Sequence, residues 1–122
     1  MESFSKSKIL CVGDIILDSY IQGKVERISP EAPIPVFKLG DERFVLGGAA
    51  NVARNICAGG GSCYLISVVG QDEDSRILNK LIKQERNLSV KLLKIKNRKT
   101  TKKQRYISGQ QQVLRIDNET NN

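Results

Sequence analysis

Apolar and polar positions along the 122 residues alternate between two kinds of spacing. Short apolar runs that end in glycine stand at 8–13 and 63–70, and a third apolar run stands at 90–95, as expected of buried parallel strands. Apolar residues recur at helical spacing over 49–58 and 74–86. The order strand, helix, strand, helix, strand predicts an α/β fold with a parallel sheet covered by helices.

Both predicted helices carry signals at their ends. Glycines at 59–61 end the first helix, and we expect one of them to take the left-handed conformation that often follows a helix. Acidic residues begin the second helix and Arg86 lies near its end, an order that suits the helix dipole.

Two segments depart from this order. The connection between the first strand and the first helix is about 30 residues long, far longer than a usual loop. Within it, 20–40 alternates apolar and polar residues and contains the three prolines, which favours extended edge strands. A second alternating stretch, 103–117, turns near Gly109. Together they predict a small β lid, with segments at about 20–40 and 98–117, over a site at the carboxyl ends of the parallel strands.

Composition narrows the possible chemistry. The chain has no histidine, which removes the commonest metal ligand and general base, and its three cysteines do not form a C-x-x-C pair. Cys11 and Cys57 lie in apolar surroundings, and we expect them to be buried thiols in a reducing compartment. No apolar run is long enough to cross a membrane and the N-terminus lacks a signal-peptide core, so we expect a cytoplasmic protein.

The net charge of +7 is unevenly distributed. Residues 91–105 hold eight of the twenty Lys and Arg and no acid, a pattern that a nucleic-acid-binding surface can show. No aromatic residue interrupts the run before Tyr106 and no nucleic-acid-binding motif surrounds it. A solvated face with one or two anion-contacting residues is therefore the favoured interpretation.

Two glycines, Gly47 and Gly48, come directly before the first predicted helix, and Asn51 lies in its first turn. They could bring a ligand close to backbone N–H groups, with the amide contacting a sugar hydroxyl. They could equally form a tight turn that Asn51 caps. A Walker motif is absent, and the glycines at 59–61 follow a helix, which argues against a dinucleotide-binding role for them.

Two carboxylates, Asp14 and Asp18, follow the first predicted strand. If this turn is helical or coiled back, they face one cleft and can accept hydrogen bonds from vicinal hydroxyls. The alternative is a helix cap and a surface acid.

Five stretches carry a family resemblance, and they extend from about residue 8 to 117. They are ILCVGDIILDSY, RISPEAPIPV, LGGAANVARNI, VVGQDEDSRIL and TTKKQRYISGQQQVLRID. Together they resemble the PfkB (ribokinase-like) carbohydrate kinases, and among these the bacterial heptose-7-phosphate kinases. The departures are small: Lys99 stands where proline is usual, and Gln110 where asparagine is usual.

The resemblance implies the N-terminal part of a ribokinase-like three-layer fold, as one partial domain over 1–122, and two sets of substrate contacts. The residues that would hold the sugar hydroxyls are Asp14, Asp18, Gly47, Gly48 and Asn51. The lid-side contacts to the phosphorylated sugar would be Thr101, Lys103, Arg105, Gln111 and Arg115.

The resemblance also implies a reaction. The complete enzyme would use ATP and Mg²⁺ to phosphorylate the anomeric hydroxyl of a heptose 7-phosphate for ADP-heptose and lipopolysaccharide-core synthesis. The family's catalytic base comes from a G-A-G-D turn, which does not occur in residues 1–122. We therefore expect a truncated or split kinase that is inactive alone and has a separate C-terminal half as partner. A ribokinase- or fructokinase-like substrate, and an inactive fragment that forms a homodimer through its lid, remain alternatives.

Overall fold

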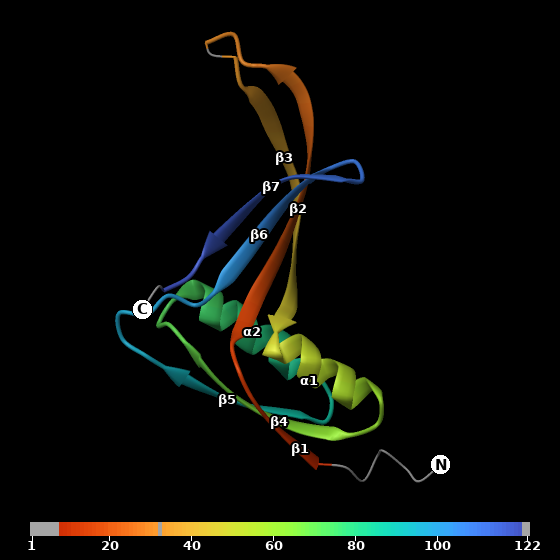
Figure 1. Ribbon diagram of the computed structural model, residues 1–122, viewed down its shortest axis with the longest axis vertical. Coiled ribbons are helices and arrows are strands. Elements are labelled where there is room, and N and C mark those ends of the chain that lie inside the picture. The colour runs from red at the N-terminus through yellow and green to blue at the C-terminus, as the bar shows by residue number, and fades with distance from the viewer. Residues whose placement is uncertain (1–7, 32, 121–122) are drawn as a thin grey trace.

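The computed structural model describes residues 8–31 and 33–120 of the chain. These residues form two sheets and two helices (Figure 1). The elements in chain order are β1 Lys8–Val12, β2 Ile15–Ile28, β3 Pro35–Gly48, α1 Ala49–Ala58, β4 Ser62–Val69, α2 Glu73–Lys83, β5 Leu88–Lys94, β6 Lys102–Ser108 and β7 Gln111–Asn118.

The first sheet, the body sheet, contains β1, β4 and β5 in the order β1-β4-β5, and both pairs of strands are parallel. The three apolar runs therefore form the predicted parallel strands, with bounds shifted by at most two residues. Helix α1 spans the predicted 49–58. Helix α2 ends at Lys83, so Arg86 lies beyond it rather than in its last turn.

The ends of both helices follow from local sequence. After α1, Gly60 adopts a φ of 99° and its N–H donates to the Cys57 carbonyl, while Gly61 donates to Ile56. This pair of bonds is the Schellman arrangement, which confirms the left-handed glycine. At the start of α2, the side chain of Asp72 accepts a hydrogen bond from the backbone N–H of Ser75 and so caps the helix.

The second sheet, the lid sheet, has the order β3-β2-β6-β7. Strand β2 pairs antiparallel with β3 and parallel with β6, and β6 pairs antiparallel with β7. Strand β2 begins at Ile15, so the residues after Asp14 are extended, and the helical or coiled turn that would bring Asp14 and Asp18 to one cleft does not form. The paired strands also continue to Gly48, so the β structure extends beyond 20–40 on both sides.

The turn between β6 and β7 is short because a glycine occupies it. Gly109 has a φ of 62° and, with Gln110, links the two strands in a two-residue hairpin. Figure 1 shows the β2–β3 hairpin extending away from the body sheet, with β6 and β7 beside its lower part.

The hydrophobic core lies where the helices meet both sheets. Helices α1 and α2 contact β2 and β3 of the lid sheet, and α1 also contacts the body sheet. Leu65 of β4, Leu78 of α2 and Leu17 of β2 are fully buried in one cluster. Alternate residues of β2 therefore face this core, and the residues between them face the other side of the lid sheet. In the described part of the chain, no helix is long and apolar enough to span a membrane.

Candidate functional site

The carboxyl end of β1 meets the start of α1 through a glycine. Gly48 has a φ of 60°, and an added Cβ would lie 2.5 Å from the main-chain oxygen of Asp14. That oxygen accepts a 2.8 Å hydrogen bond from the N–H of Ala49. Gly48 is the N-cap of α1 and no side chain caps the helix, so the interpretation of Asn51 as a cap is wrong. Glycine is required here because the backbone is left-handed and closely packed.

Asp18 forms a compact contact between three strands of the lid sheet. Arg105 Nη1 of β6 donates a hydrogen bond to Asp18 Oδ1 of β2 over 3.0 Å, and the two side chains are only 22% and 17% exposed. Gly47 of β3 packs against the same carboxylate, where any Cβ would overlap Asp18 Oδ2. A glycine at position 47 thus leaves space for the Asp18 carboxylate, which in turn orients the guanidinium of Arg105.

Strand register extends this contact into a row of charged residues. Asp18 pairs with Lys103 across β2 and β6, and Arg105 pairs with Arg115 across β6 and β7. Paired residues lie on the same face of a sheet. The charged row consists of Asp18, Lys103, Arg105 and Arg115. It brings together four of the residues that the resemblance implies, and Asp117, which pairs with Lys103 across β6 and β7 and contacts Arg115, adds a second carboxylate beside the three cations.

Two further residues lie beside the charged row. Tyr20 pairs with Arg105 and with Arg43, and both guanidinium groups lie over its ring, 5.4 Å and 5.1 Å from the centroid. These contacts support the orientation of Arg105. Neither Tyr20 nor Arg43 was predicted from the sequence. The alternation of side chains along an extended strand could have identified Tyr20, because it places Tyr20 on the same face as Asp18, two residues earlier.

Other predicted site residues lie apart from the charged row. The exposed Asp14 lies four positions before Asp18 along extended chain, about 13 Å away. Asn51 is exposed on the first turn of α1 and borders a groove of about 530 Å³ between α1 and the end of α2. Gln111 begins β7 at the hairpin turn, at the far end of the strand from the body sheet. No contact in the described structure joins these three residues to Arg105.

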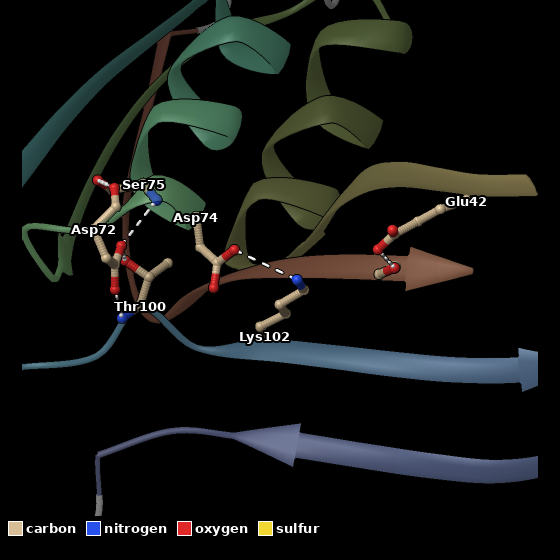
Figure 2. A network of polar contacts seen from close by, with 7 residues as sticks. Glu42, Asp72, Asp74, Ser75, Thr100 and Lys102 are labelled. Carbon is tan, nitrogen blue, oxygen red and sulfur yellow. Dashed lines mark hydrogen bonds and ion pairs between the residues drawn. The ribbon is translucent and has the colours of Figure 1, made fainter. Parts of the chain in front are cut away.

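A second polar cluster fixes the base of β6 to the start of α2 (Figure 2). Asp72 accepts hydrogen bonds from the backbone N–H of Thr100 over 2.9 Å and from its hydroxyl over 2.6 Å, in addition to the capping bond from Ser75. The hydroxyl of Thr100 in turn accepts a 3.0 Å bond from the N–H of Gly70. Thr100 and Ser75 are each 1% exposed. These bonds satisfy buried polar groups and locate the residue from which β6 starts.

The pKa of Asp72 reflects these contacts. Burial acts to raise the pKa, but hydrogen bonds from Thr100 and Ser75 outweigh burial and lower it below its ordinary value. Next to this cluster, Lys102 Nζ lies 3.5 Å from Asp74 Oδ1 and 5.6 Å from the ring centroid of Phe44. Acids at the start of this helix were expected, but the role of Asp72 was not predicted, although the D-x-x-S capping pattern indicates it.

One residue that departs from the family pattern makes a hydrogen bond that the usual residue could not make. Lys99 stands where the resemblance has proline, and its backbone N–H donates a 2.7 Å hydrogen bond to the hydroxyl of Thr120. A proline has no N–H and could not make this bond. The contact links the segment before β6 to the residues after β7.

The three cysteines lie near one another on β1, α1 and β4. Cys63 is buried, whereas Cys11 and Cys57 are only half-buried, so the expectation that the latter two are buried is wrong. Burial, together with the neighbouring Cys11 thiol 3.2 Å away, raises the pKa of Cys63 to about 12. The Cys63 thiol therefore stays protonated at neutral pH and is a poor nucleophile.

The basic residues at 91–105 lie on more than one structural element. It spans the end of β5, a connection and the start of β6, where Lys102 and Arg105 pair with acidic residues. This agrees with the favoured interpretation of a solvated face with a few anion contacts. Within 8–31 and 33–120, no group of three or more His, Cys, Asp or Glu is placed to hold a metal ion.

The sequence of the chain matches one protein family and several known proteins. The family described as "pfkB family carbohydrate kinase" matches residues 6–122. The chain is 46% identical over 118 residues to the bifunctional protein HldE of Rhodospirillum rubrum, and 47% identical over 117 residues to that of Caulobacter sp. strain K31. These matches cover 97% and 96% of this chain. The chain spans only 24% of the length of either relative.

Solved structures show the same fold. The chain matches the phosphofructokinase-2 of Escherichia coli in complex with fructose-6-phosphate, with a TM-score of 0.67 and 25% identity, over 91% of this chain and 34% of that one. It matches a carbohydrate kinase from Agrobacterium tumefaciens with a TM-score of 0.72 and 21% identity, over 92% of this chain and 35% of that one.

The family match covers the body sheet, both helices and the lid sheet, and its structural relatives share this arrangement. The fold is therefore α/β and ribokinase-like, as expected, and the family implies ATP and a divalent metal in general. The chain belongs to the PfkB family of carbohydrate kinases.

Proposed function

We propose that this chain supplies the sugar-phosphate-binding part of a PfkB kinase whose acceptor is a heptose 7-phosphate. One observation carries the proposal: Asp18 and Arg105, 87 residues apart in sequence, form a mostly buried pair against Gly47, with Lys103 and Arg115 beside them. A carboxylate accepts hydrogen bonds from sugar hydroxyls, and Arg and Lys side chains bind phosphate. The heptose assignment rests on the resemblance of the RISPEAPIPV and QQQVLRID stretches.

The chain's own residues would bind and orient the acceptor rather than perform the transfer. Asp18 would accept hydrogen bonds from hydroxyls, and the cations would neutralise the sugar phosphate. ATP, when bound in the complete kinase, supplies the γ-phosphoryl group. We propose that a separate C-terminal portion supplies the nucleotide site and the base, because residues 1–122 contain no G-A-G-D turn. This function requires the cytoplasm, where ATP is available.

Calorimetric titration tests the binding proposal. We expect the purified chain to bind D-glycero-D-manno-heptose 7-phosphate more tightly than fructose 6-phosphate, ribose or inorganic phosphate. Arg105→Gln should weaken this binding at least tenfold, whereas Arg76→Gln should leave it unchanged, because Arg76 pairs only with Glu73 on the exposed start of α2. Thermal melts of both variants establish that they are folded.

Four outcomes would contradict the proposal. Absence of binding at millimolar heptose phosphate would reject it, as would equal binding by the Arg105→Gln variant. Preference for fructose 6-phosphate would replace the heptose assignment with a fructokinase-like one. Formation of a heptose bisphosphate by the chain with ATP and Mg²⁺ would overturn the separation of binding from catalysis.

A second candidate function is homodimer formation through the lid sheet. Strand β7 is an edge of that sheet, and Leu114 and Ile116 on it are 53% and 41% exposed. An exposed apolar edge strand favours pairing with another chain. Light scattering should then give twice the monomer mass, and Leu114→Lys should reduce it to the monomer. A monomeric wild-type protein would exclude this candidate.

A further inference from the structure

A row of residues crosses the lid sheet at the level of Tyr20. Tyr20 of β2 pairs with Arg43 of β3 on one side and with Arg105 of β6 on the other. Arg105 in turn pairs with Arg115 of β7. Paired residues lie on the same face of a sheet, so the arginine row consists of Arg43, Tyr20, Arg105 and Arg115. It shares Arg105 and Arg115 with the charged row, and Arg43 is a further cation that the family resemblance does not imply.

The arginine row contains an unfavourable pairing of like charges. Arg105 and Arg115 stand directly opposite each other on β6 and β7, a position in which like charges destabilise a sheet. Two carboxylates compensate part of this repulsion: Asp18 lies 3.0 Å from Arg105, and Asp117 lies 3.0 Å from Arg115. In the part of the chain that the structure describes, the ion pairs do not include Arg43. This face therefore keeps positive charge, and a bound anion would relieve the repulsion.

The charge of this face suits a phosphate monoester. Register places Asp18, Lys103 and Asp117 in a line next to the arginine row. The two lines together hold four cations and two carboxylates, which leave two positive charges, and only one would remain without Arg43. Asp41, two residues before Arg43, falls in a register shift of β3 and forms no ion pair with it within 8–31 and 33–120. A phosphate monoester carries about −1.5 to −2 charges at neutral pH, so Arg43 supplies the charge that completes the match.

The ring of Tyr20 holds two of these cations without neutralising them. Arg43 and Arg105 come from the strands on either side of β2, and their guanidinium groups lie 5.1 Å and 5.4 Å from the ring centroid. Cation–π attraction orients each group and leaves its charge for a ligand. A side chain that is already held loses less conformational entropy when it binds than a free one does. Tyr20 is half-buried and Arg43 is exposed, so the ring is anchored in the sheet while the guanidinium of Arg43 can reach a ligand.

We propose that Arg43 binds the phosphate group of the acceptor sugar together with Arg105, and that Tyr20 is a positioning residue for both guanidinium groups. Arg43 then determines the preference for a phosphorylated sugar over an unphosphorylated one, whereas Tyr20 acts through the two arginines. The proposal rests on the proposed function of the sugar site. It adds β3 to the two strands, β6 and β7, on which the resemblance implies phosphate contacts.

Calorimetric titration of Arg43 variants tests the phosphate contact. Arg43→Gln should weaken binding of D-glycero-D-manno-heptose 7-phosphate about tenfold, the loss expected for one hydrogen bond to a charged group, and leave binding of unphosphorylated D-glycero-D-manno-heptose unchanged. Arg43→Lys keeps the charge and should restore most of the affinity. Arg76→Gln is the matched control, because it removes an exposed arginine at the start of α2. The melting temperature of Arg43→Gln should be no lower than that of the wild type, since no ion pair is lost.

Substitution of Tyr20 tests the positioning role. Tyr20→Phe keeps the aromatic ring and should bind heptose 7-phosphate as the wild type does. Tyr20→Leu removes the ring and should weaken this binding roughly fivefold, because two cation–π contacts are lost. In the Arg43→Gln background, Tyr20→Leu should have a smaller effect, since one of the two groups that the ring holds is already absent.

Each other outcome contradicts the proposal. If the wild type binds heptose 7-phosphate and Arg43→Gln binds it equally well, the phosphate contact is rejected while the proposed function stands. If the wild type does not bind it, both are rejected. Equal losses of the phosphorylated and unphosphorylated sugars would show that Arg43 has only a structural role. Weaker ATP binding by Arg43→Gln, with heptose 7-phosphate binding unchanged, would assign Arg43 to the nucleotide phosphates instead. Equal losses from Tyr20→Phe and Tyr20→Leu would reject the positioning role of the ring.

Discussion

The body sheet and the lid sheet are held in place by different forces. In the body sheet, the inward residues of β4 are packed against two helices, and Leu65 and Val69 are fully buried. In the lid sheet, every residue of β7 is exposed, and the strands are joined mainly by their backbone hydrogen bonds. Packing therefore fixes the body sheet and the inward side of β2 and β3, whereas backbone pairing and a few polar contacts at the base fix β6 and β7.

The base of the lid sheet carries these polar contacts. Asp72 holds Thr100, and Lys102 pairs with Asp74. The N–H of Leu17 donates a 2.9 Å hydrogen bond to the carbonyl of Thr101. The start of β6 is thus attached both to α2 and to β2. Because β6 carries Lys103 and Arg105, these attachments also determine where the charged row lies.

The largest expected effect comes from the packed body. Leu65→Ala removes a fully buried side chain and leaves a cavity, and it should lower the free energy of unfolding by about 2–5 kcal/mol. Leu39→Ala, on the exposed part of the lid sheet, should change it by less than about 0.5 kcal/mol. Chemical denaturation of both variants measures the difference. Similar losses at the two positions would contradict the contrast between packed body and exposed lid.

The next effect is expected at the junction of the two regions. Asp72→Ala removes the helix cap and leaves the buried groups of Thr100 without an acceptor, so it should destabilise the protein by about 2–3 kcal/mol. Asp74→Ala, which removes only the Lys102 pair, should cost less than about 1 kcal/mol. Equal losses would show that the junction does not depend on Asp72.

The lowered pKa of Asp72 adds a pH test of the same contact. The ionised carboxylate contributes stability above the pKa of an unfolded Asp, about 3.9, and that contribution is lost as the pH falls through the lower folded pKa. The stability difference between the wild type and Asp72→Asn should therefore narrow from pH 7 toward pH 3. A constant difference over this range would contradict the assignment.

A smaller effect is expected within the lid sheet itself. Gly47→Ala forces a Cβ into the Asp18 carboxylate, which should cost about 1–3 kcal/mol and weaken heptose 7-phosphate binding at least tenfold. Gly109→Ala is the control, because a Cβ there meets nothing within 4 Å and only the positive φ is strained. It should leave ligand binding unchanged. If Gly47→Ala binds heptose 7-phosphate as tightly as the wild type does, Asp18 does not contact the ligand.

The smallest expected effect on stability is at Arg115. Its pair with Asp117 is exposed, so Arg115→Gln should change the free energy of unfolding by less than about 0.5 kcal/mol. Titration should nevertheless show weaker heptose 7-phosphate binding, because a cation of the charged row is lost. Unchanged affinity would restrict the phosphate contacts to Lys103 and Arg105.

Elements that depend on short-range patterns could be predicted from the sequence. The strands at 8–13 and 63–70, helix α1 and the glycine after it follow from apolar spacing and turn chemistry, and they formed within two residues of their expected bounds. The family could likewise be recognised from the five contiguous stretches of sequence that carry the resemblance. The end of α2 was less accurate, because the apolar spacing continues past the residue at which the helix stops.

The segment after β1 shows where short-range patterns fail. Asp14 and Asp18 are four positions apart, a spacing that suits one face of a helix or one face of a strand. Strand β3 and strand β6 pair with β2 on either side, and the backbone hydrogen bonds of this pairing stabilise the extended form. The partners come from residues 35–48 and 102–108, so the outcome depended on contacts that local spacing does not encode.

The sequence by itself determined the secondary structure of the body and the family, because both depend on local periodicity and on contiguous motifs. Only the tertiary structure decided that Asp18, Gly47 and Arg105 meet, since parallel pairing of β2 with β6 joins residues 87 positions apart. It also decided which face of the body sheet the two helices cover. Both helices pack on one side, and that choice is made by the combined packing of the core rather than by any single segment.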